Sequence, residues 1–221
     1  MNFDFSPIAD NWRFFASGLG MTVLLSIVSA ATSLLAGLVI ALLRLYGPRW
    51  LRPLLVFYID SMRAIPVLVV LIWIYFAFPI IANVTFPPFW AALVALTLHI
   101  AAYAAEVIRA GIESIRPGQT RAALALGMSR AQILRKVLLP QAIVRMLPAF
   151  GSILTIAIKD TAIATVIAVP ELMHRAETVA GQSYRPVEVF TAVMVAYFCI
   201  LFPVTRGVDR LYRRFAHLGR S

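Results

Sequence analysis

Two adjacent charges, Lys159 and Asp160, stand inside an otherwise apolar segment. They follow Pro148 by eleven and twelve residues, which corresponds to roughly 17 Å along a helix. In a membrane-spanning segment this length places them near the middle of the bilayer, where charged groups are costly and usually functional. The alternative is a structural pair that neutralises itself. Because neighbouring side chains on a helix point about 100° apart, a direct salt bridge is awkward, and solute binding is the preferred interpretation.

His99 and Glu106 are the polar residues of a second apolar run. Tyr103 and Glu106 follow His99 by four and seven residues, so the three share one helix face. Ionisable groups avoid lipid, so this face is predicted to point into protein. Two roles stay open here: a structural one, with a hydrogen-bonded histidine, which is preferred, and a contact with a transported solute.

None of these groups forms a catalytic pattern. The sequence contains no G-x-x-x-x-G-K-[ST] phosphate loop and no Ser/His/Asp constellation with catalytic spacing. Cys199 is the single cysteine, which excludes an intramolecular disulfide and a CxxC metal site. We therefore expect a protein that is not an enzyme by itself, with no metal and no cofactor of its own.

The composition is that of a membrane protein. Of the 221 residues, 61% are hydrophobic, and residues 14–43 and 64–105 contain no Asp, Glu, Lys or Arg. Since one helical span needs about 20 apolar residues, we expect an all-α integral membrane protein of one domain, residues 1–221. Its five spans are predicted at about 18–43, 55–78, 89–109, 142–168 and 187–205.

The basic residues predict the orientation. The net charge of +10 comes from arginines that lie between and after the apolar runs, as expected of cytoplasmic loops, and not of a nucleic-acid-binding patch. Arg44, Arg49 and Arg52 follow the first span, and Arg206, Arg210, Arg213, Arg214 and Arg220 follow the last. The N-terminus is predicted outside and the C-terminus inside. Asp60 and Arg63, three residues apart, are either a local ion pair or a contact with a neighbouring subunit.

Residues 115–141 are the one long polar and basic insertion, and they predict two short helices around a turn. Pro117 suits a helix start, Gly127 permits the turn, and Ser129 with Gln132 forms a capping box. Pro140 disfavours helical backbone at Leu139, so a bend is expected there. We call residues 115–141 the elbow and predict that it is a docking device at the membrane surface.

The elbow resembles the cytoplasmic coupling loop of ABC importer permeases, whose pattern is Glu-Ala-Ala, three residues, Gly, nine residues, Ile-x-Leu-Pro. The matching residues are Ala122, Ala123, Gly127, Leu139 and Pro140. Val137 replaces the isoleucine, and Arg121 replaces the glutamate. The flanking segments EVIRAGIESI, LPQAIVRMLP, IKDTAI and RAIPVLVVLIWIYF extend the likeness and are similar to the polar amino-acid uptake branch, the histidine, glutamine and arginine permeases.

This resemblance implies a subunit that forms half of the path for a polar amino acid in the bacterial inner membrane. It implies three partners: cytoplasmic ATPase subunits that bind ATP and magnesium, a second permease chain, and an extracytoplasmic binding protein. The residues it assigns to ATPase coupling are Arg121, Ala122, Ala123, Gly127, Ser129 and Pro140. It also makes Asp160 a candidate contact for a cationic or zwitterionic substrate. The arginine at the glutamate position suggests an adapted ATPase or, as our hypothesis, the divergent half of a heterodimer.

Two other readings of the sequence are open. An ATP-independent secondary transporter or channel subunit would explain the charges at 159 and 160 but not the capped elbow. A membrane assembly factor that transports nothing would make those charges structural.

Overall fold

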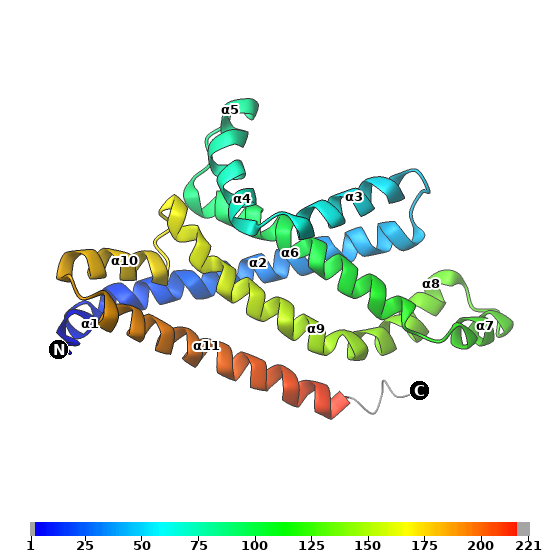
Figure 1. Ribbon diagram of the computed structural model, residues 1–221. Helices are drawn as coiled ribbons and strands as arrows, with labels where there is room; N and C mark the ends of the chain where they lie inside the picture. Colours follow the sequence, from blue (N-terminus) through cyan, green and yellow to red (C-terminus); the bar gives the residue numbers. More distant parts are fainter. Residues whose placement is uncertain (1–2, 216–221) are drawn as a thin grey trace.

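The computed structural model describes residues 3–215, which form helices and no strand (Figure 1). In chain order the elements are α1 Ser6–Asp10, α2 Trp12–Tyr46, α3 Leu51–Ala64, α4 Val67–Ile72, the π-helical turn η1 Trp73–Ala77, α5 Phe78–Ala82, α6 Pro88–Glu113, α7 Pro117–Ala125, α8 Arg130–Ile133, the π-helical turn η2 Leu134–Leu138, α9 Leu139–Asp160, the 3-10 helix η3 Thr161–Ile167, α10 Leu172–Ser183 and α11 Pro186–Phe215. Arg220, one of the basic residues used to predict the orientation, lies outside the described residues.

Within residues 3–215, four helical segments are long and apolar enough to cross a membrane: Trp12–Tyr46, Pro88–Glu113, Arg130–Ile167 and Pro186–Phe215. A fifth span exists only if α3 and the segment Val67–Ala82 are counted together, and these bend by 107° where they meet. All-helical architecture with four to five candidate spans confirms the predicted fold class.

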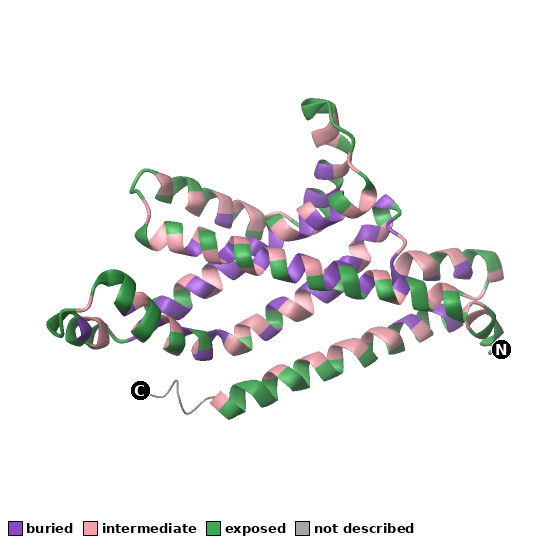
Figure 2. Cartoon of the chain, turned by 180° about the vertical axis from the view of Figure 1, so that it is seen from behind, coloured by how far each residue is buried: buried purple, intermediate pink, exposed green. Residues whose placement is uncertain are grey.

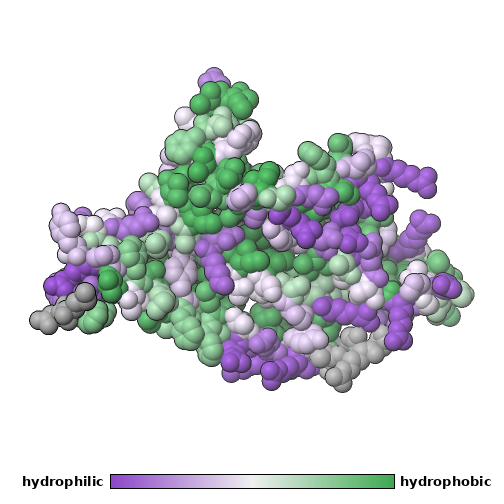
Figure 3. Space-filling model, in the orientation of Figure 1, coloured by the Kyte–Doolittle hydropathy of each residue, from purple (hydrophilic) through white to green (hydrophobic). Residues whose placement is uncertain are grey.

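The segment predicted as one span over 55–78 is broken at Pro66. Ile65 has extended backbone, with φ −85° and ψ 131°, because the proline ring disfavours helical backbone in the residue before it. A kink was expected at Pro66, but the chain turns by 107°, and α4 to α5 project from the bundle as an arm (Figure 1). Figure 3 shows this arm as hydrophobic surface.

Helix α6 is the centre of the bundle. It packs against α2, α3, α4 and α9, and 14 of its 26 residues are buried, seven of them alanine. Figure 2 shows buried residues along α2, α6 and α9, whereas α11 is exposed over most of its length. The alanines let neighbouring helices approach closely, which is how helices associate where lipid replaces water.

The face that α2 turns toward α6 carries small residues at every fourth position. Ser29, Ser33, Gly37 and Ala41 are all buried. A Cβ added at Gly37 would lie 2.6 Å from the Cβ of Ala104 and 2.9 Å from the backbone nitrogen of Ala105. The two helices therefore touch backbone to backbone at Gly37.

Glu171 connects three helices at the end of the bundle that lies away from the elbow. This residue is fully buried, and its carboxylate accepts hydrogen bonds from the backbone nitrogens of Met173 at 2.9 Å and His174 at 2.7 Å. The hydroxyl of Thr22 on α2 donates to it at 3.3 Å, and that of Tyr197 on α11 at 3.4 Å. Glu171 thus caps α10 and joins it to α2 and α11.

Substitution of Gly37 by alanine is expected to lower the free energy of unfolding by about 1–3 kcal/mol, the range for overpacking a tight contact. Gly20→Ala on the same helix is the matched control, because no described heavy atom lies within 4 Å of its added Cβ. The measurement is thermal unfolding of the full chain in detergent micelles. Equal melting temperatures for the two variants would contradict the close contact at Gly37.

Candidate functional site

The elbow lies at one end of the bundle, where α2, α6 and α9 end or begin (Figure 1). Its buried residues Ile115, Ala123 and Ile133 belong to one hydrophobic cluster with residues of α2, α3, α6 and α9: Ala41, Ile59, Ala105, Ile108, Ile112, Ala142 and Met146. The elbow is therefore packed onto the helix ends and is not a free loop.

The turn of the elbow is set by Gly127. Its φ is +73°, a left-handed conformation that glycine adopts without steric cost. The nitrogen of Gly127 donates to Leu124 O at 2.9 Å, and the nitrogen of Met128 donates to Ala123 O at 3.1 Å. These two bonds are the Schellman arrangement that ends a helix at a left-handed glycine, so the turn predicted at Gly127 is confirmed.

The second helix of the elbow begins as predicted. The Ser129 hydroxyl accepts a hydrogen bond from the Gln132 nitrogen at 3.3 Å, and the Gln132 side chain accepts one from the Ser129 nitrogen at 2.8 Å. Both bonds of the capping box are present. Pro117 begins α7 in the first helical turn, as expected.

The prediction of a bend at Leu139 is wrong. Leu139 has helical backbone, with φ −59° and ψ −45°, and α8, η2 and α9 run on as one helical segment from Arg130. Pro140 has no N–H to donate, and its ring would clash with a carbonyl of the preceding turn of an α-helix. The wider π-helical turn over Leu134–Leu138, in which the Leu139 nitrogen bonds to Leu134 O, makes room for it.

The outer surface of the elbow is unusually apolar at its tip. Leu126 is 82% exposed and Leu124 is 52% exposed, beside exposed Arg121 and Ala122. Arg121, at the position of the motif glutamate, makes no ion pair within residues 3–215 and lines a cavity of about 620 Å³ with Thr120 and Glu113. Sequence reasoning missed the two leucines, although leucine beside the turn glycine of a polar segment is a signal for a docking contact.

Lys159 and Asp160 do not pair with each other in the described part of the chain. Lys159 is exposed, and with Ser152 and Thr155 it forms one face of α9. This face and residues Thr205 and Asp209 of α11 line a groove of about 450 Å³. Asp160 is half-buried and ends α9. Their depth in the membrane stays a prediction.

His99 is buried in the middle of α6 at 7% exposure. The centroid of its ring lies 5.3 Å from that of the Tyr103 ring. The guanidinium of Arg63, on α3, lies 5.7 Å from the centroid of the same Tyr103 ring. The hydrogen-bonded histidine that was expected is not what the structure shows, because Nδ1 is buried and has no partner among the described residues. Arg63 contacts Tyr103 and forms no ion pair with Asp60 within residues 3–215.

Glu106 lies toward the elbow end of α6 and is held by two arginines. Its Oε2 is 2.7 Å from Nη1 of Arg44 on α2, and Nε of Arg109 donates to both carboxylate oxygens of Glu106 at 3.2 Å. Arg109 also pairs with Glu113. Such a chain of alternating charges joins α2 to α6, which favours the structural role for Glu106 over solute contact.

The four residues predicted to face a solute are thus not brought together. Lys159 and Asp160 lie at the end of α9 away from the elbow, His99 lies within α6, and Glu106 lies near the elbow (Figure 1). Of these four residues, Lys159 is the one that lines an open groove. Ser152 and Thr155 belong to it and were missed, although they precede Lys159 by seven and four residues, a helical spacing that the sequence shows.

Replacement of Glu106 by glutamine is expected to lower the free energy of unfolding by about 1–3 kcal/mol, because Arg44, only 16% exposed, would lose its counter-charge. Asp60→Asn is the control, since Asp60 is exposed and unpaired among residues 3–215. Thermal unfolding of both variants makes the measurement. Unchanged stability in Glu106→Gln together with lost solute uptake would contradict the structural role.

Comparison with known proteins identifies the family. Residues 33–217 match the family described as binding-protein-dependent transport system inner membrane component. The glutamine transport system permease protein GlnP of Escherichia coli K12 is 35% identical over 215 residues, which cover 97% of this chain and 98% of that protein. The arginine transport system permease protein ArtQ of Bacillus subtilis is 35% identical over 213 residues, with 95% and 97% covered.

A solved structure described as an amino acid ABC transporter with histidines superposes with a TM-score of 0.90 at 34% identity, covering 97% of this chain and 100% of that one. A chain of the MetNI methionine ABC transporter superposes with a TM-score of 0.80 at 22% identity and shows the shared fold. The resemblance read from the elbow is confirmed: the chain belongs to the binding-protein-dependent transport system inner membrane components, the multi-pass permease subunits of ABC importers.

Proposed function

We propose that this chain is the membrane subunit of an ATP-driven importer for a polar amino acid, moved by a separate ATPase through the elbow. The observation that carries the proposal is the elbow itself: a Schellman turn with an 82% exposed leucine at its tip, packed onto the ends of the spans. A large apolar side chain held in water on a rigid turn is suited to insertion into a partner's groove.

The substrate class rests on the relatives. The names of the similar permeases specify glutamine and arginine transport, and the solved neighbour is described as an amino acid transporter. A zwitterionic solute needs both a cationic and an anionic contact. The groove beside α9 offers both signs, with Lys159 and Asp209 on its walls. Lys159 and Asp160 stay our candidates for the path.

The elbow end is proposed to be cytoplasmic. The arginines of the α2–α3 loop, the elbow and the end of α11 gather at this end of the molecule (Figure 3). Cytoplasmic segments carry such an excess of basic residues. In the proposed orientation the N-terminus is outside, the described end of α11 is inside, and α10 lies on the side where an extracytoplasmic binding protein would deliver the solute.

A second permease chain is proposed to close the path. The groove between α9 and α11 is open along one side, and polar groups such as Lys159 are costly against lipid. A second copy or a homologous chain facing this side would turn two open grooves into one enclosed path. The heterodimer suggested by Arg121 stays our hypothesis for this second chain.

The coupling step follows from the covalent order of the elements. The ATPase binds ATP and magnesium and moves as it hydrolyses the nucleotide, while the permease chain supplies no ATPase site of its own. Gly127 fixes the turn, buried Ala123 attaches α7 to the bundle, and Ser129 starts the helix that continues through Pro140 into α9. Displacement of the elbow would therefore move α9, which carries the groove.

Leu126→Ser is expected to weaken binding of the ATPase about tenfold or more, because burying a leucine contributes about 1.5–3 kcal/mol. Val187→Ser is the control, since Val187 is 61% exposed at the start of α11, at the end of the bundle away from the elbow (Figure 1). The measurement is the affinity of the purified permease for the ATPase in nanodiscs, with thermal unfolding to show that both variants fold. An unchanged affinity, or solute uptake by vesicles that hold the permease without any ATPase, would favour the ATP-independent transporter instead.

A further inference from the structure

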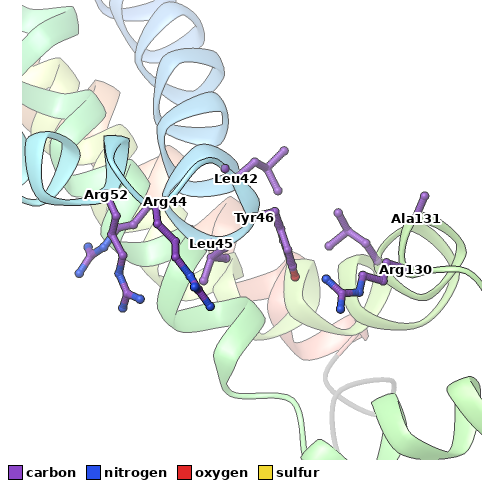
Figure 4. Close-up of a pocket in the computed structure, with 10 residues that line it drawn as sticks. Leu42, Arg44, Leu45, Tyr46, Arg52, Arg130 and Ala131 are labelled. Carbon is purple, nitrogen blue, oxygen red and sulfur yellow. The ribbon is translucent and has the colours of Figure 1, made fainter.

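We propose that the elbow end carries a binding site for the headgroup of an anionic phospholipid. The site is a cavity of about 650 Å³ between the α2–α3 turn and α8. Four arginines line it: Arg44 from the end of α2, Arg49 from the turn, Arg52 from the start of α3, and Arg130 from α8 (Figure 4). This cavity is separate from the groove beside α9, and Arg130, Ala131 and Leu134 of its lining belong to the elbow.

The arginines leave an uncompensated positive charge in this cavity. Arg44 is paired with Glu106. Arg49, Arg52 and Arg130 are exposed and make no ion pair or hydrogen bond within the described part of the chain. Figure 4 shows Arg44 and Arg52 on one side of the cavity and Arg130 on the other, with Tyr46 between them. Arginine binds phosphate oxygens through paired N–H groups, so this arrangement suits a phosphate diester.

A second feature is a buried donor without a partner. Nε of Arg44 has no hydrogen-bond acceptor among the described residues, although it is buried. Arg44 is anchored by Glu106 from behind, so its guanidinium is held in place at the wall of the cavity. An anion that enters the cavity would meet the guanidinium of Arg44 at its wall, already held in place by Glu106.

The apolar walls indicate a lipid and not a soluble phosphate. Leu42, Leu45 and Leu134 line the same cavity as the arginines. The adjacent face of α2 exposes Leu35, Val39 and Leu43, at 66%, 56% and 37%, and exposed apolar residues on a spanning helix suit acyl chains. A headgroup in the cavity would therefore continue into acyl chains along α2.

Aromatic residues mark the depth of the cavity. Tyr46 is 54% exposed and Trp50 is 69% exposed, both in the segment that supplies three of the arginines. Tyrosine and tryptophan gather at the headgroup level of membranes, and basic pockets between spans on the cytoplasmic side bind anionic headgroups. Cavity, charge and aromatic residues thus lie at one level.

The test is native mass spectrometry of the full chain in detergent, titrated with phosphatidylglycerol or with phosphatidylcholine. Wild type is expected to bind phosphatidylglycerol preferentially. The triple variant Arg49→Gln, Arg52→Gln, Arg130→Gln should lose on the order of a hundredfold in that affinity, since each arginine near an anionic surface contributes about a factor of five. Arg13→Gln, Arg116→Gln, Arg135→Gln removes the same charge at exposed positions outside the cavity and should retain the preference.

Three results would overturn the proposal. Equal losses in both triple variants, with unchanged thermal unfolding, would mean a general charge effect without a site. Displacement of bound lipid by millimolar inorganic phosphate would mean a soluble anion site. If the variant Arg49→Gln, Arg52→Gln, Arg130→Gln retained lipid binding but lost ATPase binding, the arginines would face an acidic protein surface. Each result leaves the proposed importer function intact, because none of them depends on solute transport.

Discussion

The contact between α2 and α6 is the constraint on which the other helices depend. In lipid the hydrophobic effect does not drive spans together, so close packing and polar contacts must do it. Gly37 meets the backbone of α6 directly, and Ser29, Ser33 and Ala41 extend the same small-residue face. With α2 fixed in this way, α6 presents its other faces to α3, α4 and α9.

The same arrangement connects the elbow to the groove beside α9. The cluster that buries Ile115, Ala123 and Ile133 includes residues of α2, α3, α6 and α9, so the elbow moves only with the helix ends. The segment Arg130–Ile167 is continuous. The second half of the elbow and the α9 wall of the groove are therefore parts of one helical segment. The charge chain from Arg44 through Glu106 to Arg109 and Glu113 stiffens the neighbouring helix ends. Between the elbow and Lys159 this helical segment contains the π-helical turn and Pro148, the two positions where the proposed movement of the elbow could bend it.

Local rules predicted the elbow well because its geometry is determined by nearby residues. Gly127 allows a left-handed backbone, and the side chains of Ser129 and Gln132 supply hydrogen-bond acceptors for backbone N–H groups at the start of the helix. Both features can therefore be predicted from a few neighbouring residues. The π-helical turn could not be read in the same way. Pro140 predicts a conflict with α-helical backbone, but the chain can resolve it by a bend at Leu139 or by a wider turn before it, and packing decides. The 107° break at Pro66 is a similar case.

Contacts distant in the sequence account for the rest. Arg44 and Glu106 are 62 residues apart, so periodicity along α6 could place Glu106 on an inward face but could not show that arginines already occupy it. His99 shares that face, yet its Nδ1 has no partner among the described residues, which no spacing rule reveals. The groove of Lys159 could be predicted only in part, because its second wall comes from α11.

The central claim is that the turn at Gly127 passes the movement of an ATPase to the permease. The direct measurement is solute-stimulated ATP hydrolysis by the complete complex in lipid with Gly127→Val or Gly118→Val. A β-branched residue at φ +73° is strained by about 1–3 kcal/mol, whereas no described heavy atom lies within 4 Å of a Cβ at Gly118. We predict that the assembled Gly127 variant loses the stimulation and the Gly118 variant retains it. Full stimulation in the Gly127 variant would contradict the claim.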